Sequence, residues 1–305
     1  MPVPLPLTLL RAAVLSPLKR PRPDAAPPST RLTLTTTPDP DHLAAYEEIC
    51  GFEAGDALPL TYPHVLAFPL AMRLMAARDF PLPLLGLVHT SIEITQYHPL
   101  PRPTSGSEQL QLTVHTETLA PHHRGTEATL TTEATLHGEL LWHSRSTYLA
   151  RHKTSTPKPN APTHTHTPQQ PTPTPTPTAP GIDWPLPADL GRRYAAISGD
   201  RNPIHLHPLT ARPFGFPRPI AHGMWTIARC AAEHGSKDRS EGAAYLKAEF
   251  KAPVPLPSTV TYTAHGPSAF ELHSSTGKPH LTGTLTREPS AAPPSGPPAP
   301  PTRSS

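Results

Sequence analysis

The stretch YAAISGDRNPIHLHPLTARPFGFPRPIAHGMWTIAR, from Tyr194 to Arg229, carries most of the information about the fold and chemistry of this chain. Near its start, Asp200, Asn202 and His205 follow an Asp-x-Asn-x-x-His spacing. Such a trio can hold and activate one water molecule, because a carboxylate accepts a proton, an imidazole donates or accepts one, and an amide fixes the geometry. We expect Ser198 to support this loop by hydrogen bonding.

The local sequence predicts a loop followed by a helix. Asn202 precedes Pro203, and a residue before proline is disfavoured in the helical conformation. An irregular loop would let Asp200 and His205 converge. The apolar residues after Gly223 then recur at helical spacing, at Met224, Ile227, Ala228 and Ala231.

Simpler interpretations of the same residues exist. Asp200 and Asn202 can organise a turn before Pro203 without any catalytic role. Ser198 could be read as a nucleophile, but nothing around it resembles a nucleophile elbow.

A metal site is the other alternative. His207 lies two residues beyond His205, and His164 and His166 sit in the run THTHT. No third ligand has a suitable spacing, so we expect no bound metal and no cofactor.

The prolines divide the chain. There are 47 of them in 305 residues, and they concentrate in TSTPKPNAPTHTHTPQQPTPTPTPTAP and in the C-terminal residues. Neither segment has the apolar content to offset its ordering entropy. We therefore predict an N-terminal half (1–150), a disordered Pro/Thr-rich linker (151–182), a C-terminal half (183–287) and a disordered tail (288–305).

Charge and cysteine content exclude several classes of protein. The net charge is +3 and the basic residues are scattered, which does not favour nucleic-acid binding. The two cysteines, Cys50 and Cys230, fit neither a metal motif nor a disulfide framework. The N-terminal apolar run is broken by prolines and Arg11, and no segment reaches eighteen uninterrupted apolar residues. We expect a cytoplasmic chain without stable membrane insertion.

The two halves show the same order of patterns. In the first, an apolar helix is predicted from Tyr62 to Phe80, kinked or delayed by Pro69. Its inward stripe would hold Val65, Phe68, Met72 and Met75. Strands are expected after it, with apolar residues of one parity at Val88, Ile92 and Ile94 and at Leu110, Leu112 and Val114, and then over 126–136 and 140–149.

In the second half, the helix after Gly223 is followed by alternation at Leu246, Ala248 and Phe250 and at Val260 and Tyr262, with weaker strands over 270–273 and 280–286. One long helix followed by antiparallel strands, repeated twice, predicts an α+β fold. Each sheet would wrap around its helix and pair with its copy.

The motifs around the trio resemble those of a known family. SGD at Ser198–Asp200, NPIH at Asn202–His205, GF at Gly215–Phe216 and AHGM at Ala221–Met224 resemble the hydratase 2 motif of MaoC-like proteins. These are (R)-specific enoyl-thioester hydratases and dehydratases with a hot-dog fold. The N-terminal half, at 58–75 and 84–89, is more loosely similar to the less catalytic half of double hot-dog members, including actinobacterial 3-hydroxyacyl dehydratases.

The resemblance implies a mechanism. The equivalents of Asp200 and His205 bind a water that adds to C3 of a trans-2-enoyl thioester, while C2 receives a proton. The reverse reaction dehydrates a 3-hydroxyacyl thioester. Gly223, at the start of a helix and without a side chain, suits an oxyanion role, because its N–H can point at the thioester oxygen.

The first half lacks the trio. His64 is loosely comparable to His222, but no acidic residue stands upstream at the right distance, so we expect one active site per chain. The acyl group would be carried by coenzyme A or acyl carrier protein, and the chain could form a homodimer. A non-catalytic acyl-binding or accessory subunit and a hot-dog thioesterase remain the alternatives to a hydro-lyase.

Overall fold

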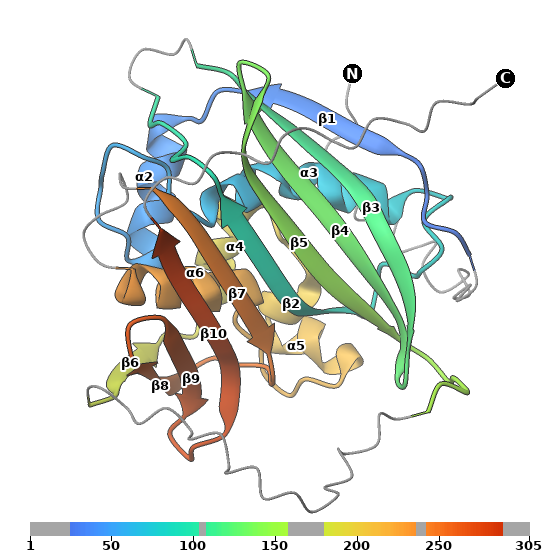
Figure 1. Cartoon of the computed structure of the whole chain (residues 1–305). Helices are drawn as coiled ribbons and strands as arrows, with labels where there is room; N and C mark the ends of the chain where they lie inside the picture. Colours follow the sequence, from blue (N-terminus) through green and yellow to red (C-terminus); the bar gives the residue numbers. More distant parts are fainter. Residues whose placement is uncertain (1–24, 104–107, 158–179, 236–241, 289–305) are drawn as a thin grey trace, which may run out of the picture.

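A computed structural model describes residues 25–103, 108–157, 180–235 and 242–288 of the chain (Figure 1). The N-terminal half contains β1 (Arg31–Thr36), α2 (Pro40–Cys50), α3 (Tyr62–Ala76), β2 (Leu87–Gln96), β3 (Leu110–His122), β4 (Gly125–Leu136) and β5 (Glu139–Arg151). The C-terminal half contains β6 (Ile182–Leu186), α4 (Leu190–Ser198), α6 (Gly223–His234), β7 (Ala243–Phe250), β8 (Ser258–His265), β9 (Ala269–Ser274) and β10 (Pro279–Glu288).

One connection of the C-terminal half carries extra short helices. Between α4 and α6 lie η2 (Pro203–His205), α5 (Pro208–Ala211) and η3 (Arg212–Phe214). This connection contains Asp200, Asn202 and His205.

The strands form one antiparallel sheet in the order β1-β3-β4-β5-β2-β7-β10-β9-β8-β6. Each half supplies five neighbouring strands, and the order in the second half mirrors the order in the first. The halves join where β2 pairs with β7, from Ser91 opposite Glu249 to Gln96 opposite Ala244. The expected α+β double hot-dog fold is confirmed, with the two sheets continuous across this joint.

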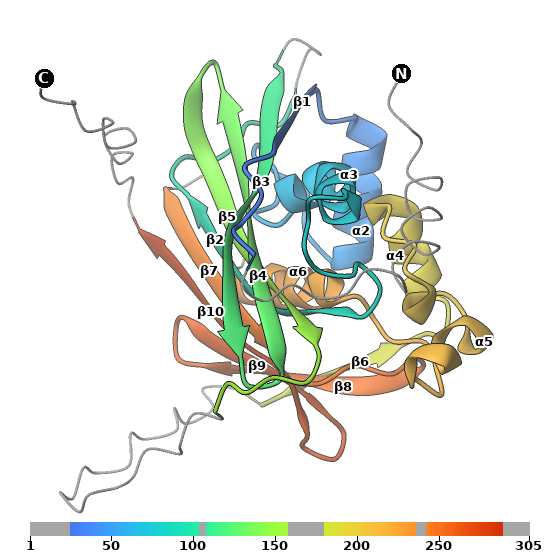
Figure 2. The same cartoon turned by 90° about the vertical axis from the view of Figure 1, so that its right-hand side faces the viewer.

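The helices lie on one face of the sheet, which curves around them (Figure 2). α3 packs against β3 and β4, and α6 packs against β9 and β10. The residues expected to line the inward stripe of α6 are all buried, and Ile227 and Ala228 are completely inaccessible. Burying these apolar surfaces between helix and sheet is the main source of stability for such a layered fold.

Several elements differ from the sequence prediction. Each half has a first strand and a first helix, β1 with α2 and β6 with α4, that the apolar pattern did not indicate. Helix α3 begins at Tyr62 and continues through Pro69, so the proline does not delay its start.

The prediction that Val88 shares the buried face of its strand with Ile92 and Ile94 was also wrong. Val88 is 37% exposed although Ile92 and Ile94 are buried. The pairing of β2 with β5 shifts register between His89 and Ser91, and this irregularity turns Val88 to the opposite face.

The predicted linker and tail lie mostly outside the described residues. Strand β5 ends at Arg151 and β6 begins at Ile182, the first and last residues of the predicted linker, while residues 158–179 are not described. Strand β10 ends at Glu288 and residues 289–305 are not described. The domain boundaries remain a prediction.

Candidate active site

The Asp200 loop is built by successive hydrogen bonds from side chains to the backbone. The Asp200 N–H donates to Ser198 Oγ at 3.2 Å, and the Asn202 N–H donates to Asp200 Oδ1 at 3.1 Å. The Ile204 N–H then donates to Asn202 Oδ1 at 3.4 Å. Short polar side chains close tight turns in this way, so these residues organise a turn around Pro203 whatever their chemical role. These bonds leave Asp200 Oδ2 free of any contact within the turn.

Ser198 and Asn202 therefore contact the loop. Ser198 is the last residue of α4 and is buried. Asn202 caps η2 through its side-chain oxygen. Both are placed to fix the position of Asp200, and their supporting role in catalysis stays a prediction.

His205 is buried and held through one ring nitrogen. Its Nδ1 lies 2.7 Å from the carbonyl oxygen of Ile220. A carbonyl oxygen can only accept, so the neutral ring carries its proton on Nδ1 and presents Nε2 as an acceptor. Burial lowers the pKa of His205, although the Asp200 charge and the Ile220 carbonyl oppose that shift. His205 is thus held neutral with one nitrogen ready to accept a proton.

A glycine lets the His205 loop approach α4. A Cβ atom on Gly191 would lie 2.0 Å from the carbonyl oxygen of His205, far inside van der Waals contact. Any side chain at this position would displace His205. Gly191 was not apparent from the sequence, because its role depends on a contact between two segments.

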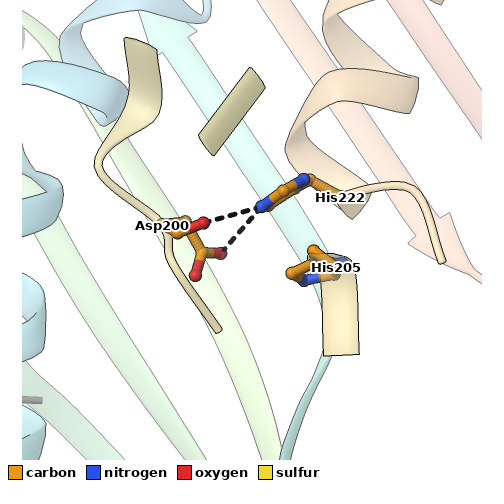
Figure 3. A group of neighbouring side chains, drawn as sticks. All are labelled: Asp200, His205 and His222. Carbon is orange, nitrogen blue, oxygen red and sulfur yellow. Dashed lines mark hydrogen bonds and ion pairs between the residues drawn. The ribbon is translucent and has the colours of Figure 1, made fainter. Parts of the chain in front are cut away.

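The side chain of His222 lies beside those of Asp200 and His205 (Figure 3). Its Nε2 lies 2.9 Å from the backbone oxygen of Asp200 and 3.9 Å from Oδ2. The His205 and His222 rings stack with centroids 3.7 Å apart and planes at 26°. Burial, with the neighbouring His205, holds the pKa of His222 well below its usual range. The sequence motif AHGM contains His222 but assigned it no role; its position directly before Gly223 was the available signal.

A metal ion could in principle use these three residues, since one donor atom from each lies within 4.8 Å of the others. The Nδ1 of His205 and the Nε2 of His222 each donate a proton to a carbonyl oxygen, so the Nε2 of His205 and the Nδ1 of His222 carry the free lone pairs. That the protein binds no metal stays a prediction.

Gly223 is the first residue of α6. Its N–H therefore has no partner within the helix, and it stands at the positive end of the helix dipole. A Cβ atom there would lie 3.0 Å from the ring of Phe250 on β7. The site brings together a carboxylate, a neutral imidazole and a helix N-terminus.

Comparison with known proteins agrees with this picture. Residues 160–267 match the model of the MaoC like domain. The chain is 38% identical to 3-hydroxyacyl-thioester dehydratase X of Mycobacterium tuberculosis, over 91% of this chain and 96% of that protein. It is 39% identical to an (R)-specific enoyl-CoA hydratase of Aeromonas caviae, over 22% of this chain and 52% of that protein.

The fold comparison points to the same relative. The crystal structure of HtdX from Mycobacterium tuberculosis superposes with a TM-score of 0.69 and 32% identity, covering 85% of this chain and all of that chain. The chain belongs to the MaoC-like family, and within it the similarity to the dehydratase HtdX extends over both halves. Among the described residues, no helix is long and apolar enough to cross a membrane.

Proposed function

We propose that this protein is a hydro-lyase that adds water to trans-2-enoyl thioesters and removes it from (R)-3-hydroxyacyl thioesters. The observation that carries the proposal is the cluster of the Asp200 carboxylate and the His205 imidazole, with one ligand atom of each within 4.8 Å of the other, beside the start of α6. The names of the similar proteins, a 3-hydroxyacyl-thioester dehydratase and an (R)-specific enoyl-CoA hydratase, support this reaction class.

The geometry suits one bound water. A water that donates one hydrogen to each of two acceptors about 2.8 Å away holds those acceptors roughly 4.5 Å apart, and one ligand atom each of Asp200, His205 and His222 lie within 4.8 Å of one another. Asp200 and the neutral His205 both accept, so the water donates one hydrogen to each. Its oxygen lone pair is then turned outward, toward C3 of the substrate.

In hydration, the water oxygen forms a bond to C3 and one of its protons passes to the Asp200–His205 pair. The π electrons move onto the thioester oxygen as an enolate. The Gly223 N–H and the helix dipole stabilise this developing charge, which an aqueous environment would stabilise less effectively. The pair then returns a proton to C2, so the net change is the addition of one water. Dehydration runs through the same steps in reverse.

We extend the proposal to the carrier of the acyl group, the cellular compartment and the oligomeric state. The acyl group would be carried on coenzyme A or acyl carrier protein, with no further cofactor. The physiological form would be a cytoplasmic protein that can pair as a homodimer of double hot-dog chains. Both cysteines, Cys50 and Cys230, are free and buried, which suits a reducing compartment.

Crotonyl-CoA tests the reaction class directly. Loss of the enoyl-thioester absorbance, with (R)-3-hydroxybutyryl-CoA as the main product by chiral chromatography, is expected. Release of free thiol would instead indicate a thioesterase, and binding without either change an accessory acyl-binding subunit. A predominance of the (S)-product would mean that the substrate lies across the loop in another direction.

Gly223→Val tests the oxyanion role. A branched side chain would meet the Phe250 ring and push the thioester oxygen away from the N–H of residue 223. We expect a loss of at least about 10²-fold in kcat, the usual cost of losing one such donor. Full activity of Gly223→Val would contradict the assignment of Gly223.

A further inference from the structure

Two histidines of the N-terminal half, one buried and one partly buried, lie beside the active site although this half lacks the trio. His64 is near the start of α3 and is 6% exposed; His89 is on β2. Their rings stack with centroids 6.2 Å apart and planes at 9°. His89 also stacks on Tyr148 of β5, with ring centroids 4.5 Å apart.

Phe250 connects this pair to the catalytic loop. The ring of His89 lies 4.9 Å from the ring of Phe250. Phe250 in turn lies against Gly223, close enough to meet a Cβ placed there. A continuous path of contacts therefore runs from the N–H proposed to bind the thioester oxygen to the two histidines. The negative charge of Asp200 also opposes the lowering of the His64 pKa by burial, so the two groups interact electrostatically.

Both histidines keep a buried nitrogen without a hydrogen bond. Within the described residues, His64 Nδ1 and His89 Nε2 have no partner. Burial lowers the pKa of His64 to about 4 and that of His89 to about 3, so both rings are neutral near pH 7. A neutral imidazole can donate or accept, and leaving its nitrogen unpaired in the interior costs stability. An unpaired, buried polar atom beside an active site is explained if a substrate group pairs with it.

We propose that His64 and His89 bind the thioester end of the substrate through these two nitrogens, opposite Asp200 and His205. Polar atoms at that end are the thioester oxygen and the first amide of the carrier arm. The N-terminal half thus supplies one wall of the active site and holds the substrate against Gly223. This inference rests on the proposed function and adds the residues that position its substrate.

The test uses apolar and polar replacements in the full chain. His64→Leu and His89→Phe remove the nitrogens. His64→Asn keeps a polar atom near the place of Nδ1, and His89→Gln keeps one near the place of Nε2. Activity is measured with crotonyl-CoA and with crotonyl-N-acetylcysteamine, which has the thioester and first amide but no phosphates. The melting temperature of each variant is measured in parallel.

We expect each apolar variant to lose about tenfold in kcat/KM with both substrates, the effect of one lost hydrogen bond. Most of the loss should appear in KM. The melting temperature of His64→Leu should stay the same or rise, because an unpaired buried polar group has been removed. His89→Phe also loses the hydrogen bond between the His89 ring and the Ser91 backbone, so its melting temperature should fall slightly. The polar variants should recover most of the activity.

Three results would overturn the inference. The first is full kcat/KM in both apolar variants. The second is a loss that follows a lower melting temperature and is not restored by Asn or Gln, which would mean a structural role. The third is a loss with crotonyl-CoA that disappears with the short thioester, which would place the contact farther along the carrier. Wild-type turnover and an inactive Asp200→Asn variant in the same assay separate these outcomes from failure of the proposed function.

Discussion

The two halves of the chain have the same architecture and different chemistry. Each begins with a strand, continues with two helices and ends with four antiparallel strands. In each, the first helix ends at a glycine in the left-handed conformation, Gly51 and Gly199, both with φ of 74°. The halves diverge after this glycine. The N-terminal connection runs directly to α3, whereas the C-terminal one carries η2, α5 and η3 before α6.

This difference teaches that the architecture is repeated, whereas the proposed catalytic pair, Asp200 and His205, lies in one connection only. The N-terminal half contacts the two helices that flank this connection, α4 and α6. Trp225 of α6 donates its indole N–H to the Ile49 carbonyl at 2.9 Å. His42 of α2 contacts the Tyr62 hydroxyl and the Ile197 carbonyl, each at 2.8 Å. These contacts link α2 to α3, α4 and α6.

The largest expected effect comes from removing the catalytic pair. Asp200→Asn and His205→Ala should each lower kcat by at least ~10²-fold, because each removes a group that takes or gives a proton at one bound water. Steady-state hydration of crotonyl-CoA measures the loss, and circular dichroism checks that the fold is intact.

Asp56→Asn is the matched control for this comparison. Asp56 is an exposed carboxylate in the corresponding connection of the N-terminal half. Its substitution should leave kcat within about twofold. Near-normal turnover in Asp200→Asn would contradict the catalytic role of Asp200. A loss in Asp56→Asn as large as in Asp200→Asn would contradict the proposal that the catalytic carboxylate lies only in the C-terminal connection.

The next effect concerns the close approach of α4 to the His205 loop. Gly191→Ala should lower kcat about tenfold or more and destabilise the protein by about 1–3 kcal/mol, because the new methyl group must push the His205 carbonyl away. Activity and urea denaturation measure the two effects. Ala196→Ser, at an exposed position of the same helix, is the control and should change neither quantity. Wild-type behaviour of Gly191→Ala would show that the loop adjusts without cost.

A smaller effect is a fall in stability at acid pH. In the folded protein the pKa of His64 is lowered to about 4 and that of His89 to about 3, against about 6.5 in the unfolded chain. Below pH 6.5 the unfolded state therefore binds more protons than the folded state does. The free energy of unfolding should decrease by up to about 1.4 kcal/mol per pH unit for each such histidine, and the slope should end near each folded pKa.

Urea denaturation between pH 7.5 and 5 measures this slope. His64→Leu should reduce it by roughly one proton, since it removes one of the groups that titrate only on unfolding. An unchanged slope in His64→Leu would mean that His64 is protonated as easily in the folded protein as in the unfolded one.

The smallest effect is expected from the segment between the halves. Deleting residues 158–177 should shift the melting temperature and kcat little, because its composition provides few apolar contacts and the entropy of closing a connection varies slowly with length. A collapse in soluble yield or activity would show that this segment packs against one of the halves.

The sequence predicted the core strands and the second helix of each half, because their apolar residues repeat with the periods of strands and helices. It did not predict β1, α2, β6 or α4. The buried stripe of α2, at Leu43, Tyr46, Glu47 and Cys50, includes a carboxylate that interrupts the apolar pattern, and β6 alternates over only five residues. The parity of Val88 failed for a related reason, since a strand irregularity depends on the paired strand.

For the candidate site, the sequence by itself determined which residue types are proposed for catalysis and their order along the chain. Asp200, Asn202 and His205 are close along the chain, and the turn that joins them is made by their own side chains. The tertiary structure alone decided the partners that come from elsewhere. Three features of the site depend on contacts between separate segments of the chain. They are the stacking of His222 on His205, the close approach of Gly191 to the His205 carbonyl, and the position of His64 and His89 beside Phe250. Local hydrogen bonds leave a signature in residue spacing, whereas close packing between distant segments is fixed only when the sheet closes around its helices.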